Sequence, residues 1–376
     1  MKRFLIVGAG ILGASTAYHL ARAGAEVTIV DRSHKGQATD AAAGIVCPWL
    51  SQRRNKAWYE LVKGGARYYP ELVKELKELG EVDTGYRQVG AISLHTDEDK
   101  LEKMADRART RREDAPEIGE IKILSSLETK KLFPPLASEY GSVHVSGGAR
   151  VNGRQLRNAL LNAAKKLGAK ILCGDARLLF DDHTITGVSL EGQRLNADKV
   201  IVTGGAWSHE LFKPLGLRFL VRPQKAQIVH LEMKRVETGN WPVVMPPNDQ
   251  YILSFESGRV VIGATHEDEA GFDHRVTAGG MHEVLNKALA VAPGLESCNI
   301  VETRVGFRPY TPGFLPIIGH VPNWKGVLVA NGLGASGLTS GPYLGGELAK
   351  LALNLPTGLQ IENYDTAGAI EIDNEL

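Results

Sequence analysis

The sequence predicts an α/β protein in which a doubly wound, mostly parallel sheet is interleaved with a second α+β domain that holds a large mixed or antiparallel sheet. Two glycine-rich turns, each between an apolar strand and a helix, predict the parallel sheet: one follows residues 4–7 and the other follows residues 327–331. Because these turns stand near opposite ends of a chain of 376 residues, the strand-rich middle is expected between parts of the first domain and not after it.

The first glycine-rich turn lies in the segment VGAGILGASTAYHLARAGAEVTIVDR, residues 7–32. An apolar run, a helix expected over 14–22 and a second apolar strand surround three glycines in the pattern GxGxxG. In such a turn Gly8 permits the tight bend, Gly10 lets the backbone approach a pyrophosphate, and Gly13 lets the helix pack close to the strand. The free N–H groups at the helix N-terminus attract negative charge, so the segment predicts a dinucleotide site.

Asp31 ends the second strand of this unit, 18 residues after Gly13. A carboxylate at this position accepts hydrogen bonds from a ribose diol and repels a 2′-phosphate. The glycine pattern alone is also compatible with a tight turn that binds nothing. The strand, helix, second strand and terminal acid in register favour dinucleotide binding.

The composition is that of an ordinary globular protein, with 43% hydrophobic and 23% charged residues. The 44 basic and 43 acidic residues leave a formal net charge of +1, so no general field attracts nucleic acid or anionic lipid. Three widely spaced cysteines form no CxxC pair, which argues against a disulfide framework or a metal site and predicts a reducing, cytoplasmic location. No run of about 18 apolar residues occurs, which predicts no transmembrane segment; a homo-oligomer remains open.

The second glycine-rich loop, VLVANGLGASGLTSGP, distinguishes between dinucleotides. Its helix is expected to begin after a cap at Thr339 or Ser340, with Pro342 at the first helical position. One interpretation is a flexible loop with a good helix cap. The other is that this helix N-terminus meets the far end of the same ligand. A reduced flavin carries negative charge near N1 and O2 that a helix dipole stabilises, whereas a nicotinamide has no such need, so the second interpretation predicts FAD.

Five segments together resemble the D-amino acid oxidase-like family of FAD-dependent oxidoreductases, and within it most the glycine oxidase branch. They are the first glycine-rich turn, TDAAAGIV (39–46), VTGGAWS (202–208), SGRVVIGAT (257–265), and GFRPYTPGFLPIIG (306–319) with the glycine loop behind it. The resemblance implies a Rossmann-like FAD-binding domain interleaved with an α+β substrate domain. The FAD-binding domain would comprise 1–83, 149–217 and 306–376, and the substrate domain 84–148 and 218–305.

The resemblance also implies how FAD is held, with the ADP half on the first turn and the isoalloxazine ring near the second loop. The cysteine that binds flavin covalently in sarcosine oxidase-like relatives has its counterpart near Phe307 and Arg308, so non-covalent FAD is expected. The expected cofactor contacts are Gly8, Gly10, Ile11, Leu12, Gly13, Asp31, Arg32, Thr39, Ala42, Ala43, Gly44, Ile45, Arg177, Thr203, Gly204, Trp207, Arg308, Gly332, Gly334, Ala335, Ser336, Gly337, Leu338 and Thr339.

The resemblance and the side-chain chemistry together give the residues expected at the substrate. Arg308 in GFRPYT stands where the glycine oxidase pattern has a carboxylate clamp; an ordinary ion pair is the alternative. Tyr251 in DQYILSF matches a tyrosine over the substrate carboxylate, unless it is a core tyrosine with a satisfied hydroxyl. His266 in GATHED could deprotonate an incoming ammonium, unless it belongs to a solvated polar turn.

One expected clamp is missing from the sequence. The second arginine of the glycine oxidase branch falls at Ala335. Arg54, or its neighbour Arg53, follows the flavin-contacting segment as the arginines of sarcosine-type enzymes do, and could compensate. The alternative is a surface charge that flanks a helix.

These features predict an FAD-dependent oxidoreductase, an amino acid or amine oxidase or dehydrogenase. It would dehydrogenate a small amine or amino acid, of the glycine, sarcosine or D-amino acid type, by hydride transfer to flavin N5, giving an imine that hydrolyses. The electron acceptor would be O₂ or another carrier. An NAD-dependent dehydrogenase on the same fingerprint and a non-catalytic flavin-binding protein are the alternatives.

Overall fold

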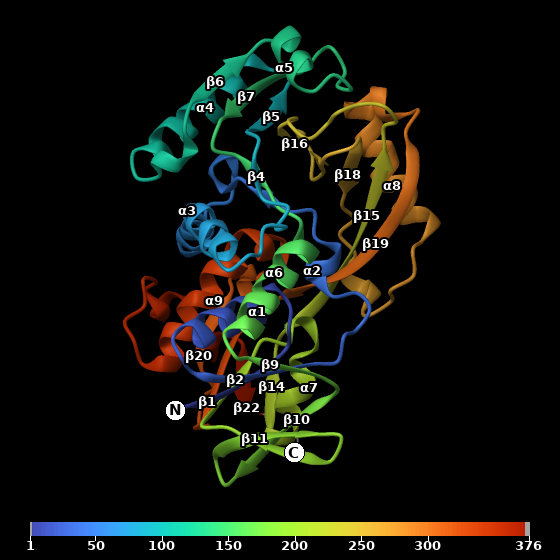
Figure 1. Cartoon of the computed structure of the whole chain (residues 1–376). Coiled ribbons are helices and arrows are strands. Elements are labelled where there is room, and N and C mark those ends of the chain that lie inside the picture. The colour runs from blue at the N-terminus through green and yellow to red at the C-terminus, as the bar shows by residue number, and fades with distance from the viewer. Residues whose placement is uncertain (1, 373–376) are drawn as a thin grey trace.

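A parallel sheet forms the lower half of the molecule (Figure 1) in the computed structural model, which describes residues 2–372. In this part of the chain six strands pair in the order β20-β21-β13-β1-β2-β9, and all pairs are parallel except β20 with β21. The strands are β1 (Arg3–Val7), β2 (Glu26–Asp31), β9 (Lys170–Cys173), β13 (Lys199–Val202), β20 (Ile317–His320) and β21 (Val327–Asn331). This is the doubly wound arrangement that the sequence predicts.

Successive side chains of this sheet enter two different cores, because strand residues alternate between faces. Phe4 and Ile6 join a hydrophobic cluster with the helices, whereas Leu5 and Val7 join a second cluster with a small antiparallel meander. The helices on the first face are α1 (Ile11–Arg22), α3 (Lys56–Glu78), α6 (Gly153–Lys166) and α9 (Gly337–Leu353). The meander on the other face consists of β10 (Ala176–Asp181), β11 (Thr184–Leu190) and β12 (Gln193–Asn196).

A second, larger sheet stands above the first in Figure 1. Eight of the described strands pair in the order β19-β15-β18-β17-β16-β5-β7-β6, antiparallel except for β16 with β5. Its strands are β5 (Ala91–His95), β6 (Ile121–Leu124), β7 (Gly141–Val145), β15 (Arg222–Glu232), β16 (Val243–Met245), β17 (Tyr251–Ser254), β18 (Arg259–Gly263) and β19 (Asn299–Tyr310). The helices packed on it are α4 (Glu98–Arg112), α5 (Ser126–Leu132) and α8 (Ala278–Val291). The predicted fold class, a Rossmann-like domain with an α+β partner and a mixed sheet, is confirmed.

Short elements lie outside the two main sheets. Strand β8 pairs with β3 on one side and β4 on the other, and β14 pairs with β22. The remaining helices and strands are α2 (Ala38–Ala41), β3 (Ile45–Val46), β4 (Arg87–Gln88), β8 (Ala149–Arg150), α7 (His209–Phe212), β14 (Leu217–Phe219) and β22 (Ile370–Ile372). The strands of the parallel sheet fall within the ranges expected for the FAD-binding domain, while β19 runs across the boundary expected at residue 306. The exact division into domains stays a prediction.

One local expectation from the sequence was wrong. Helix α9 begins at Gly337, not after Thr339 or Ser340, and Pro342 lies inside it. Helix α3 is continuous through Gly64 and Gly65; a Cβ on Gly65 would overlap the Thr339 carbonyl oxygen, so this glycine allows close packing of α3 on α9. In the charged stretch 97–135, β6 separates α4 from α5.

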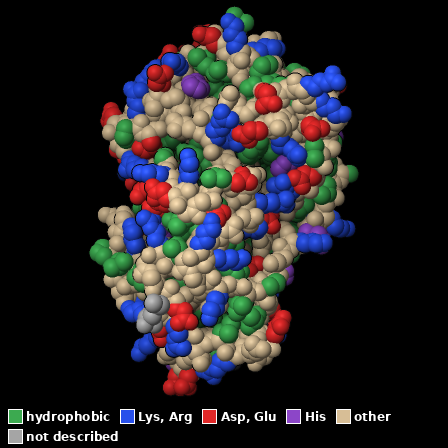
Figure 2. All heavy atoms as spheres, viewed as in Figure 1, with side chains coloured by type: hydrophobic (Ala, Val, Ile, Leu, Met, Phe, Trp, Pro, Cys, Tyr) green, Lys and Arg blue, Asp and Glu red, His purple; other side chains and the backbone are tan. Residues whose placement is uncertain are grey.

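The charged side chains are mixed on the surface, as the formal net charge of +1 implies. Figure 2 shows Lys and Arg interspersed with Asp and Glu over the face in view. Within residues 2–372, no helix combines the length and apolar character required to traverse a lipid bilayer.

Candidate active site

A cavity of about 680 Å³ lies at the carboxyl ends of the parallel strands, beneath the second sheet. The parallel sheet contributes Val7, Asp31 and Asn331 to its lining, and the second sheet contributes Tyr251 and Arg308. Ligands of open α/β sheets bind at this edge, where neighbouring strands leave a crevice. The cavity therefore brings the two glycine-rich turns together with three of the predicted substrate residues, Tyr251, His266 and Arg308.

The first glycine-rich turn leaves space for a ligand at one position and packs closely at the other two. Gly8 has φ +107°, and a Cβ there would lie 2.6 Å from the Thr203 carbonyl oxygen; a Cβ on Gly13 would overlap the carbonyl oxygen of Gly8. A Cβ on Gly10 would meet only Thr39 Oγ1, at 3.5 Å. Helix α1 begins here without a side-chain cap or an acidic residue in its first turn. These features fit the pyrophosphate of a dinucleotide.

Asp31 is held firmly at the end of β2. Its Oδ2 accepts the Ala9 N–H at 2.6 Å, and its Oδ1 accepts the Ser33 N–H at 2.6 Å and the Gln37 side-chain amide at 2.9 Å. Three donors fix the carboxylate beside the glycine turn, and each carboxylate oxygen keeps further acceptor capacity. This position suits the ribose diol that the sequence predicts.

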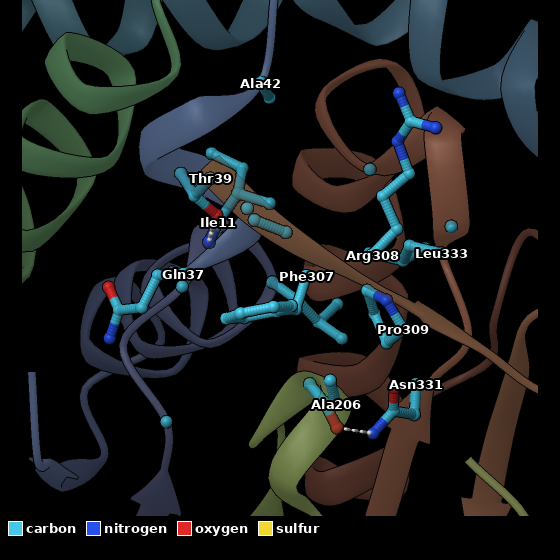
Figure 3. A pocket seen from close by; sticks show the side chains of 18 of the residues that line it. Ile11, Gln37, Thr39, Ala42, Ala206, Phe307, Arg308, Pro309, Asn331 and Leu333 are labelled. Carbon is cyan, nitrogen blue, oxygen red and sulfur yellow. Dashed lines mark hydrogen bonds between the residues drawn. The ribbon is translucent and has the colours of Figure 1, made fainter. Parts of the chain in front are cut away.

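The short segment from α2 to β3 lines the middle of the cavity. Thr39 Oγ1 accepts the Ile11 N–H at 3.0 Å, which ties the segment to α1 (Figure 3). Thr339 Oγ1 donates to the Ile45 carbonyl oxygen at 2.8 Å, which ties it to α9. The segment is therefore fixed between the two helix N-termini. The other expected residues of this region that line the cavity are Leu12, Ala42, Ala43 and Gly44.

Helix α9 also begins at the cavity without a side-chain cap and without an acidic residue in its first turn. Its N-terminal loop is braced by Trp58 Nε1, which donates to Ser336 Oγ at 3.0 Å. An uncapped helix N-terminus presents partial positive charge to the cavity. The expected residues of this loop that line the cavity are Gly334, Ala335, Ser336, Gly337, Leu338 and Thr339. Gly332 does not line it; with φ +78° it forms the turn behind the cavity, against Thr311.

The opposite end of the cavity is lined by polar and aromatic groups near the end of β2. Arg32 is paired with Asp175 at 3.1 Å and with Glu210 at 2.8 Å. The Trp207 ring stacks on Phe272 with 5.2 Å between ring centroids. This mixture of ring and fork-shaped cation suits the adenosine half of a dinucleotide. The expected residues that line this end are Arg32, Arg177, Thr203, Gly204 and Trp207.

Arg308 projects from β19 at the other end of the cavity, beside Leu333 in Figure 3. Its Nη1 donates to Gln224 Oε1 at 3.0 Å, and Gln224 Nε2 donates to Asp268 Oδ1 at 2.7 Å. Gln224 stands directly across from Arg308 in the β15–β19 register and is buried. This chain of hydrogen bonds orients the guanidinium. A further N–H group of Arg308 faces the Tyr251 hydroxyl, and the remaining N–H groups are left for a ligand.

Tyr251 and His266 lie close to Arg308 at this end. Burial raises the pKa of the Tyr251 hydroxyl, and the nearby Arg308 charge opposes that shift. Burial lowers the pKa of His266, and Arg308 lowers it further, while Asp249, with 3.7 Å between its Oδ2 and His266 Nδ1, opposes both. The tyrosine is therefore a neutral donor and the histidine a neutral base near pH 7.

The structure does not bring Arg54 to this cavity, which corrects the sequence-based expectation for that residue. Arg54 is exposed and lines a separate cavity beside the N-terminus of α3. Its neighbour Arg53 lies over the Trp58 ring, 4.8 Å from the centroid, and donates to the Phe314 carbonyl oxygen. Ser51 and Trp58 line the cavity from this region, whereas both arginines line the other cavity.

Four residues at this site have no counterpart in the sequence-based set: Asp249, Phe307 and Asn331 line the cavity, and Gln224 is hydrogen-bonded to Arg308 without lining it. Gln224 and Asp249 act through their contacts with Arg308 and His266, which a single sequence does not reveal. The only sequence feature that points to Phe307 is its position next to Arg308. Asn331, the residue before Gly332, donates to the Gly205 carbonyl oxygen at 2.9 Å (Figure 3). An Asn before a glycine at the end of a strand is a turn signal, so the sequence pattern could have identified Asn331.

The fold and this cavity define an oxidoreductase that binds a flavin dinucleotide. The chain matches the DAO family, described as FAD dependent oxidoreductase, over residues 3–351. The protein therefore belongs to this family, it is an enzyme, and it binds FAD non-covalently. The NAD-dependent and non-catalytic alternatives are set aside. Cys47 lines the cavity as well, and burial raises the pKa of its thiol to about 12, which favours the protonated form.

Individual relatives span nearly the whole chain. An uncharacterized oxidoreductase, YurR, of Bacillus subtilis (strain 168) is 66% identical over 371 residues, 98% of this chain and 100% of that protein. The crystal structure of iminodiacetate oxidase (IdaA) from Chelativorans sp. BNC1 is 47% identical, with a TM-score of 0.94 over 96% of this chain and 98% of that one. The crystal structure of glycine oxidase from Geobacillus kaustophilus is 28% identical, with a TM-score of 0.85 over 97% of this chain and 99% of that one. These findings confirm the glycine oxidase branch of the family.

Proposed function

We propose that this enzyme oxidises the carbon–nitrogen bond of a small amino acid or N-substituted glycine, the class to which glycine, sarcosine and iminodiacetate belong. The observation that carries the proposal is Arg308, whose guanidinium is oriented by Gln224 and retains free N–H groups at the cavity. Such a fork donates two parallel hydrogen bonds to a carboxylate. An α-carboxylate is therefore the substrate group that we expect against Arg308.

The neighbouring loop favours a substituent on the substrate nitrogen. Ala335 lines the cavity at the position of the family's second arginine. Its methyl group leaves room for a substituent on the substrate and places no second fixed charge there. The similarity to iminodiacetate oxidase supports a carboxymethyl substituent, and the similarity to glycine oxidases supports the unsubstituted amine. We infer that N-substituted glycines are better substrates than glycine itself.

FAD, when bound, accepts the hydride from the substrate α-carbon. The residues of this chain orient the substrate and adjust its protonation. Arg308 holds the carboxylate and the Tyr251 hydroxyl donates to it, which fixes the direction of the α-carbon. His266, whose pKa is lowered, accepts the ammonium proton at Nε2, because its Nδ1 faces Asp249. The neutral amine is the form that could release hydride from its α-carbon, and water would then convert the substrate iminium ion into an amine and glyoxylate.

Anaerobic mixing of the FAD-loaded enzyme with single compounds tests this function. The panel is glycine, sarcosine, iminodiacetate, D-alanine and D-proline, and the readout is loss of the visible flavin absorbance. We expect bleaching by N-substituted glycines, with glyoxylate as product. Dimethylamine is the matched control, since it is sarcosine without the carboxylate. If dimethylamine bleaches the flavin as fast as sarcosine does, the proposed role of Arg308 in binding the substrate carboxylate is wrong. The acceptor, O₂ or another carrier, a homo-oligomeric state and a cytoplasmic location stay predictions.

A further inference from the structure

A second cavity, of about 530 Å³, lies beside the N-terminus of α3 and has a strongly basic lining. The segment 51–58 lies between it and the FAD cavity: Ser51 and Trp58 line the FAD cavity, and residues 52–56 line the second one. Helix α4 completes the second cavity from the other side. Its positively charged lining residues are Arg53, Arg54, Lys56, Arg107 and Arg111.

None of these cations is paired with a carboxylate among residues 2–372. Arg53 donates to the Phe314 carbonyl oxygen, and Arg111 donates to the carbonyl oxygens of Trp49 and Ser51 at 2.5 Å and 2.7 Å. Within the same range, no ion pair involves Arg54, Lys56 or Arg107. The one acid in the lining, Glu60, is bound to Lys63 at 2.8 Å. The cavity therefore holds a local positive excess in a chain whose charges are otherwise balanced.

Two of the arginines are partly withdrawn from water. Arg111 lies over the Tyr59 ring, 4.4 Å from the centroid, and Arg53 lies over Trp58. Burial lowers the pKa of both arginines, and the charge of Arg107 lowers that of Arg111 further. Bringing like charges together at low solvation costs free energy, and an anion in the cavity offsets that cost.

We propose that this cavity is a second binding site, for a small anion with two or more negative charges, either a phosphate ester or a compound with several carboxylates. Planar guanidinium forks match both groups, and the volume suits a small molecule. The site is distinct from the substrate position at Arg308, so it stands whether or not the proposed substrate class is right.

Calorimetric titration of the FAD-loaded enzyme with inorganic phosphate and with citrate, at an ionic strength fixed by sodium chloride, tests the proposal. We expect saturable binding of one anion per chain, and the tighter of the two probes identifies the phosphate or the carboxylate source. The double variant Arg54→Gln with Arg107→Gln should bind at least about tenfold more weakly, because two charged donors are lost. The single variant Arg54→Gln, at an exposed position, should weaken anion binding to a smaller extent. It replaces the double variant in the test if the double variant unfolds at a lower temperature than the wild type.

Two controls separate this site from other causes of anion binding. Lys74→Gln with Lys103→Gln removes the same charge from exposed positions on α3 and α4 outside the cavity, and should bind as the wild type does. Arg308→Ala should also keep the binding. The proposal is overturned if neither probe saturates, if the lysine variant loses as much affinity as the arginine variant, or if only Arg308→Ala loses it.

Discussion

Removal of the Arg308 guanidinium is the most direct test of how the substrate is held. The guanidinium has five N–H donors, and one of its nitrogens is engaged by Gln224 at 3.0 Å. Two donors toward a substrate carboxylate are each worth about 1.5–3 kcal/mol as hydrogen bonds to a charged group. We therefore expect Arg308→Ala to lower kcat/KM for sarcosine by about 10² to 10⁴-fold, since a change of about 1.4 kcal/mol is tenfold.

The assay is steady-state and anaerobic kinetics on variants that keep their FAD and their thermal unfolding temperature. Arg222→Ala is the matched control, because Arg222 is an exposed arginine on the neighbouring strand β15 and does not line the cavity. It should leave kcat/KM unchanged. A loss of less than about threefold in Arg308→Ala, or an equal loss in both variants, would refute the carboxylate clamp.

Three further predictions concern FAD binding, the pH dependence of stability and the Tyr251 hydroxyl, which is expected to donate to the substrate. Gly13→Ala should destabilise the fold and abolish FAD binding. Gly10→Ala should weaken FAD binding and leave the thermal unfolding temperature of the apoprotein nearly unchanged, because the new Cβ meets only Thr39, at 3.5 Å. Flavin fluorescence measures FAD binding of the two variants, and calorimetry measures their stability. Burial lowers the pKa of His19 and of His230 to about 4, so the stability that depends on their neutral forms is complete above about pH 6.5 and is lost as the pH falls toward 4. Tm measured against pH should therefore decline in that window, and the decline should be smaller in His230→Gln. Tyr251→Phe should raise KM for sarcosine about tenfold, the cost of one hydrogen bond to a charged group, and an unchanged KM would make Tyr251 a packing residue.

Features set by neighbouring residues in the chain could be predicted from the sequence. The roles of Gly8 and Gly13 follow from the local strand, turn and helix, and the structure shows the close packing that excludes a side chain at both positions. Asp31 lies at the end of β2 for the same reason. These positions depend on backbone conformation over about 25 residues, which the hydrophobic pattern specifies.

Features set by pairing between distant segments could not be predicted. Gln224 is 84 residues from Arg308, and only the register of β15 against β19 brings them together. The orientation of Arg54 depends on how the segment after β3 packs against α4, which no local pattern encodes. The place of Gly65 inside α3 is likewise explained only by α9, because the missing side chain allows the two helices to pack closely.

The long strand β19 links the cofactor end of the cavity to its substrate end. Phe307 and Arg308 are adjacent, so their side chains leave the strand on opposite sides, as Figure 3 shows. Phe307 packs so closely on Gly36 that a Cβ there would overlap its ring, and its backbone N–H donates to the Gly36 carbonyl oxygen at 2.9 Å, which anchors β19 to the first domain. A slip of one residue would exchange the two side chains and remove the clamp. The contact at Gly36, together with the pairing of β19 to β15, therefore fixes the register on which the position of Arg308 at the substrate depends.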